Sequence, residues 1–266
     1  MTTNIARAAT GDNASNRRFA HEPSSEKQLR AEAKQQTKHD FPDDPNLSPE
    51  QRAWEMVLKQ NLGDFYYPRY LDDKEKGLET AWDYVNDDPR LPRVLIIGDS
   101  ISRGYTLTVR HALAEKVNLH RAPANCGCSA NGLTQLPVWL GQGRWDLILF
   151  NFGIHDRETP SEIYQEHLEW IVNRLRQTGA RLVWVSSTPV LEGAAEYHAG
   201  SIERLNGVAN ALMRRHEIPV VDLYGHVLPV LDKYQLPRNC HYQQHGYEYL
   251  GQFVAQEIGK AIKLTM

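Results

Sequence analysis

A serine and a histidine, far apart in the chain, are the residue pair best suited to nucleophilic chemistry. Ser100 follows a short apolar run, residues 94–97, and the residues after it have a helical pattern. His241 lies in a polar segment near the C-terminal end. An imidazole can take the proton of a serine hydroxyl, and N–H groups at a helix start can stabilise an oxyanion. The alternative is that Asp99 and Ser100 only cap the helix, because both residue types are good N-caps.

The elements that must position these residues alternate between strands and helices. Apolar runs without alternation are typical of strands buried on both faces. The five predicted strands cover residues 94–97, 117–121, 147–151, 182–186 and 219–223. Helices are predicted over residues 105–114, 133–140, 163–175, 202–215 and 245–262. Strands separated by helices of this length indicate right-handed βαβ units and a parallel sheet, so the fold class is α/β.

Four polar loops carry the residues that could do chemistry. Ser100 follows the first strand, residues 125–132 follow the second, residues 151–156 follow the third, and residues 239–247 lie before the last helix. In an open parallel sheet, ligands bind at the carboxyl ends of the strands. We therefore expect all four loops to meet at one edge of the sheet.

These four loops resemble, in order and approximate spacing, the four sequence blocks of the SGNH/GDSL hydrolase superfamily. The first block is Gly98-Asp99-Ser100-Ile101-Ser102, and the resemblance extends from about residue 93 to residue 262. It implies a flavodoxin-like three-layer α/β/α sandwich with a five-stranded parallel sheet, and hydrolysis of an ester, often on a carbohydrate or a lipid. Ser100 would then be the nucleophile and His241 the general base.

The resemblance also implies an oxyanion hole, in which this chain departs from the family pattern. Ser100 N–H, a backbone N–H in the second block and a side chain of the third block would bind the oxyanion. Ala130 stands where the second block usually has Gly, and its N–H can still serve. The third block, usually Gly-x-Asn-Asp, ends here in His155 and Asp156, which is typical of a recognisable subgroup. His155 can donate from a ring nitrogen, and Asn131 is the alternative source of an amide.

The fourth block lacks its usual carboxylate. The family places an Asp three residues before the His, whereas this chain has Arg238 there. Asn239 or a backbone carbonyl could hold the ring of His241 instead, which would leave a Ser-His pair. Replacing the carboxylate by an amide costs a serine protease a factor of about 10⁴ in rate.

The three cysteines allow other interpretations. Cys126, Cys128 and Cys240 could join His241 in a zinc site, although Cys-x-Cys is tighter than the usual ligand spacing. A disulfide between Cys240 and either of the other two is a second alternative, and inert thiols are the third. We favour inert thiols and expect neither a metal nor another cofactor. Three cysteines cannot all pair within the chain, which weakly favours a reducing compartment.

Composition limits the partners. The chain has 266 residues, a formal charge of −3 and 41% hydrophobic residues, enough for a sizeable core. The charge gives no reason to expect nucleic acid as a partner, and no apolar run approaches the length of a membrane span. No secretory signal is visible at the N-terminus, so we favour a cytoplasmic location. The sequence does not indicate the oligomeric state.

Three regions are predicted. Residues 1–46 are polar and are expected to form a disordered or weakly helical tail, with a charged helix over residues 26–38. Residues 47–92 should form a helical extension packed on the domain, with a helix from Ser48-Pro49-Glu50 to about Gly63 and another over residues 74–85. Residues 93–266 form the hydrolase-like domain.

Two functions remain open at this point. The favoured one is a serine esterase that removes an acyl group, such as acetyl, from a carbohydrate or a similar small ester. The alternative is a catalytically weak or inactive module of the same fold that binds a glycan or a partner protein. The departures at Arg238, Asn239 and His155 point to the alternative.

Overall fold

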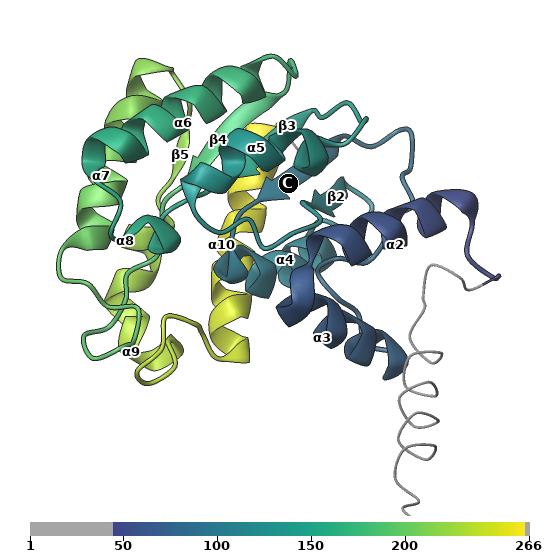
Figure 1. The fold of residues 1–266 in the computed structure, drawn as a ribbon, viewed down its shortest axis with the longest axis horizontal. Helices are drawn as coiled ribbons and strands as arrows, with labels where there is room; N and C mark the ends of the chain where they lie inside the picture. The colour runs from purple at the N-terminus through teal and green to yellow at the C-terminus, as the bar shows by residue number, and fades with distance from the viewer. Residues whose placement is uncertain (1–44, 264–266) are drawn as a thin grey trace, which may run out of the picture. The chain divides into compact units, whose positions relative to one another are not determined.

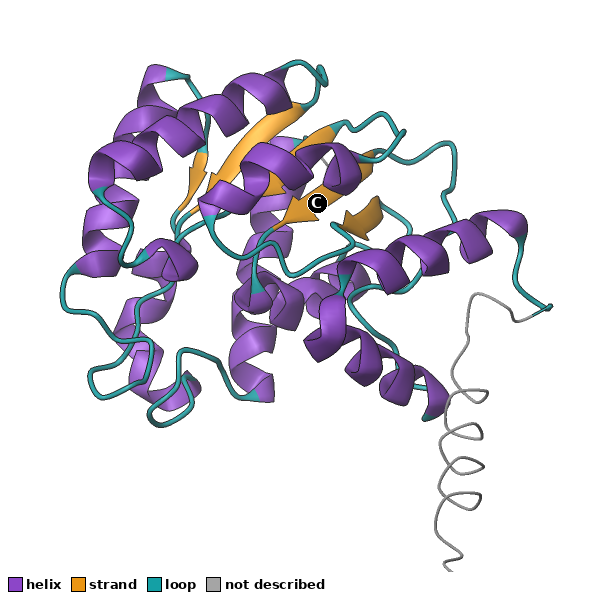
Figure 2. Ribbon diagram, viewed as in Figure 1, coloured by secondary structure: helices purple, strands orange, loops and turns teal. Residues whose placement is uncertain are grey.

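The computed structural model describes residues 45–263 (Figures 1 and 2). The predictions for the tail, including the helix over residues 26–38, lie outside these residues. At the centre is a sheet of five strands in the order β2-β1-β3-β4-β5, and each strand is parallel to its neighbours. The strands are β1 (Arg93–Ile97), β2 (Asn118–Arg121), β3 (Leu147–Phe150), β4 (Arg181–Val185) and β5 (Val220–Val221). The predicted α/β class and the five-stranded parallel sheet are confirmed.

Helices cover both faces of the sheet, because the strands are apolar on both sides. Leu95 and Ile97 point to a core shared with α5 (Ser129–Leu140), α6 (Ser161–Arg176) and α7 (Ser201–Arg215). Val94 and Ile96 point to a second core, shared with α4 (Ser100–Ala112) and α10 (Gln244–Ala261). The result is a three-layer α/β/α sandwich, with α5 and α6 on one side of the sheet and α4 and α10 on the other (Figure 1).

Two glycines let α4 and α10 approach closely. A Cβ atom on Gly104 of α4 would collide with the ring of Tyr247 on α10. A Cβ atom on Gly251 of α10 would collide with the side chain of Thr108 on α4. This close packing matters for the site, because α4 begins at Ser100 and α10 begins just after His241.

The segment before the sheet forms two helices, α2 (Pro49–Asn61) and α3 (Gly63–Glu75). Ser48 caps α2 in the expected way: its hydroxyl accepts from Gln51 N–H, and Gln51 bonds back to Ser48 N–H. The predicted helix over residues 74–85 is wrong. Gly77, in the left-handed conformation (φ 70°), ends α3, and the Gly77 and Leu78 N–H groups close the last turn.

After α3 the chain runs without a helix to β1 and contacts the rest of the domain. The indole of Trp82 donates to Ala122 O, at the end of β2. Arg110 of α4 donates to Thr80 O and Ala81 O. These contacts hold the segment beside the edge strand β2. The division at residues 46/47 and 92/93 stays a prediction.

Between β5 and α10 the chain forms three short elements that the sequence did not predict: α8 (Leu223–Val227), a 3₁₀ helix η3 (Leu228–Val230) and α9 (Leu231–Tyr234). A tight hairpin follows, in which Gln235 and Tyr242 pair in antiparallel fashion. This hairpin carries His241. None of the helices in the described residues combines the length and apolar character needed to cross a membrane.

Candidate active site

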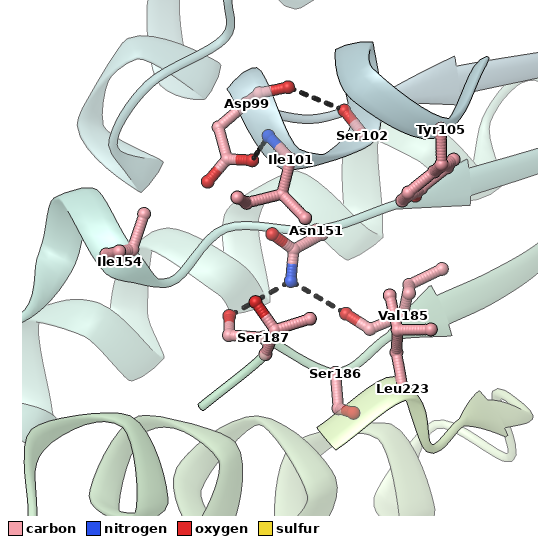
Figure 3. A pocket seen from close by; sticks show the side chains of 11 residues that line it. Asp99, Ile101, Ser102, Tyr105, Asn151, Ile154, Val185, Ser186, Ser187 and Leu223 are labelled. Atoms are coloured by element: carbon pink, nitrogen blue, oxygen red, sulfur yellow. Dashed lines mark hydrogen bonds between the residues drawn. The ribbon is translucent and has the colours of Figure 1, made fainter. Parts of the chain in front are cut away.

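Ser100 is the first residue of α4, and only Gly98 and Asp99 separate it from the carboxyl end of β1. Asp99 caps the helix, because its Oδ1 accepts from Ile101 N–H at 2.9 Å (Figure 3). The Ser100 hydroxyl takes no part in capping and bonds to His241 instead. The capping function that the sequence left open for both residues therefore belongs to Asp99 alone.

A buried arginine, which the sequence analysis missed, braces this turn. The Arg121 guanidinium donates to Gly98 O at 3.0 Å, to Asp99 O at 2.9 Å and to Ser102 Oγ at 2.6 Å. Burial lowers the pKa of Arg121 to about 10, so the side chain still carries its charge at neutral pH. Apolar patterning gave no signal for this role, because Arg121 ends a strand that also carries Asn118 and His120.

Ser100, His241 and Asn239 form a continuous hydrogen-bonded row. Ser100 Oγ lies 2.8 Å from His241 Nε2, and His241 Nδ1 lies 2.6 Å from Asn239 Oδ1. The same Asn239 oxygen lies 3.0 Å from His241 N–H. A backbone N–H can only donate, so the atom facing it must be the amide oxygen. That oxygen can only accept, which assigns a proton to Nδ1 and leaves Nε2 free to accept the proton of Ser100.

The hairpin that carries His241 is tied to the segment after β4 by Gln235, a second residue that the sequence analysis missed. The buried Gln235 amide donates to Cys240 O at 3.2 Å and to Pro189 O at 2.9 Å. Its oxygen accepts from Leu191 N–H at 2.8 Å. These three bonds hold the hairpin against the segment that follows β4.

The surroundings of His241 favour the neutral ring. Burial is the largest cause, and it lowers the pKa of His241 below its ordinary value of 6.5. The charges of Glu196 and Asp99 oppose this effect, whereas Arg103 and His155 add to it. A neutral imidazole at neutral pH is the state that a general base requires.

Two helix starts present backbone donors at the edge that carries Ser100. Ser100 and Ala130 are the first and second residues of α4 and α5. The first N–H groups of a helix have no partner inside it. An Ala at position 130 offers this donor as a Gly would, since the donor belongs to the backbone.

Asp156 lies buried and connects the third loop to the second. It belongs to a 3₁₀ helix, η2 (Ile154–Asp156), that follows β3. Its Oδ2 accepts from Ser129 N–H at 2.8 Å, and its Oδ1 accepts from the Ser129 hydroxyl at 2.6 Å. Burial raises the pKa of Asp156, and the bonds from Ser129 oppose that shift. Asp156 therefore fixes the start of α5 rather than presenting its carboxylate to solvent.

The two candidate side-chain donors differ in what holds them. His155 is exposed, makes no hydrogen bond to the other described residues, and is close enough to His241 for its charge to lower the pKa of that ring. Asn131 is exposed too, but its amide nitrogen donates to Cys126 O at 3.0 Å. The amide of Asn131 thus serves its own loop, and His155 is the freer donor.

A small cavity lies beside the serine turn (Figure 3). Asp99 and Ile101, the neighbours of Ser100, line one side of it, and Asn151 reaches across from the end of β3. The Asn151 amide donates to Val185 O at 2.7 Å and to Ser187 Oγ at 3.0 Å. The volume is about 20 Å³, which is room for roughly one water molecule.

The three cysteines are unpaired. In residues 45–263 no group of three His, Cys, Asp or Glu side chains is arranged to hold a metal ion. Cys240 Sγ lies 3.5 Å from His241 Nδ1, and burial raises the pKa of this thiol to about 12. The disulfide alternative is therefore wrong for this structure, and Cys240 faces the histidine as a neutral thiol.

Comparison with known proteins identifies the family. The profile of the GDSL-like lipase/acylhydrolase family matches residues 96–249, so the chain belongs to this family. Comparison with curated proteins gave no match.

Solved structures share the fold at low sequence identity. A lipase/acylhydrolase from Enterococcus faecalis is 23% identical, with a TM-score of 0.58 over 64% of this chain and 97% of the other. The esterase EstA from Pseudoalteromonas sp. is 16% identical, with a TM-score of 0.54 over 65% of this chain and 99% of the other. An acetylxylan esterase from Geobacillus stearothermophilus is 14% identical, with a TM-score of 0.54 over 63% and 94%.

Proposed function

We propose that this member of the family is a serine esterase that deacetylates an acylated carbohydrate or a similar small ester. The observation that carries the proposal is the row of contacts from Ser100 Oγ to His241 Nε2 and from His241 Nδ1 to Asn239 Oδ1. The row joins a hydroxyl, an unprotonated ring nitrogen and an acceptor that holds the ring. These are the parts that an activated serine needs.

In the proposed reaction, Ser100 Oγ attacks the ester carbonyl carbon while its proton moves to His241 Nε2. The negative charge on the carbonyl oxygen would be held by Ser100 N–H, Ala130 N–H and the ring of His155. The C–O bond to the alcohol then breaks, and the alcohol leaves with the proton from Nε2. Water then attacks the acyl carbon while His241 Nε2 takes a proton from it; the bond to Ser100 Oγ breaks, the acid leaves, and Oγ takes that proton back from Nε2.

The small cavity beside the serine turn does not select the acyl group, because neither Ser100 nor His241 lines it and it has room for roughly one water molecule. A fold neighbour described as an acetylxylan esterase makes acetylated xylan a sensible first natural substrate to test. The proposal does not specify the alcohol part of the substrate.

The competing function is a weak or inactive module that binds a glycan or a protein. Asn239 favours it, because a neutral amide next to His241 stabilises the protonated ring less than a carboxylate does. Hydrolysis of p-nitrophenyl acetate by wild type and by Ser100→Ala separates the two functions. The esterase proposal predicts a loss of about 10⁴-fold or more in kcat on substitution. Equal rates for the two proteins would refute it.

A further inference from the structure

The Asn239 amide beside His241 Nδ1 does not supply the negative charge that the proposed reaction needs there. When His241 takes the proton from Ser100 it becomes a cation in a partly buried position. Asn239 holds the ring through a neutral oxygen, which orients the ring but supplies no opposite charge. Transfer of a charge out of water is costly unless another charge or hydrogen bonds compensate it. A carboxylate close to this ring would supply the missing charge.

Glu196 is that carboxylate, and it comes from a different part of the chain. It lies in the segment between β4 and α7, and its Oε2 accepts from Cys240 N–H at 3.2 Å. Cys240 directly precedes His241 and is buried. The bond thus attaches the Glu196 carboxylate to the backbone of the hairpin at the position next to the base.

No cation in the described residues neutralises Glu196. It makes no ion pair with a lysine or an arginine there, and the groups that bond to it, the backbone N–H and the thiol of Cys240, are both neutral. Its charge is accordingly free to act on a cation nearby. Two negative charges raise the pKa of His241, and the charge of Glu196 has the larger effect.

The other groups that face His241 do not replace it. They are Asp99, Arg103, His155 and the Cys240 thiol. Asp99 uses its Oδ1 to cap α4, and its effect on the pKa of His241 is smaller than that of Glu196. Arg103 and His155 act in the opposite direction, and the Cys240 thiol is neutral because burial raises its pKa to about 12.

We propose that Glu196 is the positioning residue that stabilises protonated His241, so that orientation and charge compensation come from two different side chains. Asn239 orients the ring, and Glu196 both holds the hairpin through Cys240 N–H and supplies the negative charge. This inference rests on the proposed esterase function, in which His241 accepts a proton. It accounts for a site that lacks the local carboxylate and has one bonded to the residue before the base instead.

The test compares Glu196→Gln with Glu192→Gln, a matched change at an exposed residue of the same segment. Gln at 196 keeps an oxygen that can accept from Cys240 N–H and removes only the charge. The proposal predicts that the acid-side midpoint of kcat/KM against pH falls by about 0.5–1 pH unit. It also predicts that kcat on the alkaline plateau falls by a factor of about 3–10, because one pKa unit is a tenfold change in equilibrium. In Glu196→Asp, which keeps the charge, the midpoint and kcat should lie closer to the wild-type values than in Glu196→Gln. Glu192→Gln should change neither quantity.

A second readout separates this proposal from the esterase proposal. The NMR titration of the His241 ring reports its pKa whether or not the protein hydrolyses p-nitrophenyl acetate. A lower pKa in Glu196→Gln than in wild type supports the role of Glu196, even in a protein without esterase activity. An unchanged pKa refutes it, and so does a loss of rate in Glu196→Gln with no change in the pH midpoint, since that pattern indicates a purely structural residue.

Discussion

Replacing Asn239 by Asp should convert the neutral partner of His241 into a charged one with little change of shape. The Asn239 oxygen already lies 2.6 Å from His241 Nδ1 and 3.0 Å from His241 N–H. The amide nitrogen of Asn239 makes no hydrogen bond within the described residues, so the substitution removes none. The main effect should therefore be electrostatic.

The size of the effect follows from the geometry. Two unit charges about 4 Å apart attract by about 4 kcal/mol at an effective dielectric constant of about 20. That energy corresponds to about three pKa units. His241 is partly exposed, and solvent screening reduces this to about 1–2 units. The pKa of His241 should rise by that amount, because a nearby negative charge favours the protonated ring.

The assay is kcat and kcat/KM for p-nitrophenyl acetate as a function of pH. We expect the acid-side midpoint in Asn239→Asp to move up by about 1–2 pH units and kcat on the alkaline plateau to rise by about 10–100-fold, because the ring cation is better stabilised. Arg238→Gln is the control: it changes the net charge by the same amount at the neighbouring, exposed residue, away from Nδ1. If the midpoint in Asn239→Asp stays in place or moves down, the claim that His241 Nδ1–H bonds to the Asn239 side chain is refuted.

Three further predictions concern the rest of the site. In wild type, kcat/KM should fall on the acid side with a midpoint below pH 6.5, because burial lowers the pKa of His241 and the base works only when neutral. A midpoint above pH 6.5 would contradict this. His155→Ala should lower kcat by about 10²–10³-fold, as for loss of one oxyanion donor, and His155→Asn should lower it less; equal kcat for all three proteins would exclude His155 from the oxyanion hole. Asp156→Ala should lower the melting temperature by about 2–12 °C, because it leaves the buried Ser129 N–H without its acceptor, at about 1–3 kcal/mol, while the Ser129 hydroxyl keeps His167 Nδ1 as a partner at 2.9 Å. Asp156→Asn should cost less, and circular dichroism melts that show no difference from wild type would contradict the role given to Asp156.

The fold was predictable because parallel strands buried on both faces have a simple signature. Residues 94–97 are apolar without alternation, and the structure places them between two cores. The order of strands and helices then sends the ends of β1, β2 and β3 to one edge of the sheet. This topology alone places Ser100, Ala130 and His155 on neighbouring loops.

The contacts that hold the site were not predictable, because they join residues far apart in the sequence. Arg121 bonds to Gly98 O, 23 residues away, and Gln235 bonds to Pro189 O, 46 residues away. Glu196 reaches Cys240 N–H across 44 residues. Each contact depends on the path of a loop, for which apolar periodicity carries no information.

The helix wrongly predicted over residues 74–85 has a local reason. Gly77 is in the left-handed conformation and ends α3. Beyond it, Thr80 and Asp83 form a turn of their own, in which the Asp83 carboxylate accepts from Thr80 N–H and from the Thr80 hydroxyl. Such side-chain bonds compete with a helix for the backbone.

The central claim is that Ser100 is a nucleophile activated by His241, and covalent labelling tests it most directly. A fluorophosphonate probe reacts with an activated serine hydroxyl and leaves a phosphonyl group on its oxygen, which peptide mass spectrometry locates. The account predicts a single adduct on the peptide that contains Ser100, absent in Ser100→Ala and strongly slowed in His241→Ala. No adduct on wild-type Ser100, or labelling at the same rate in His241→Ala, would contradict it.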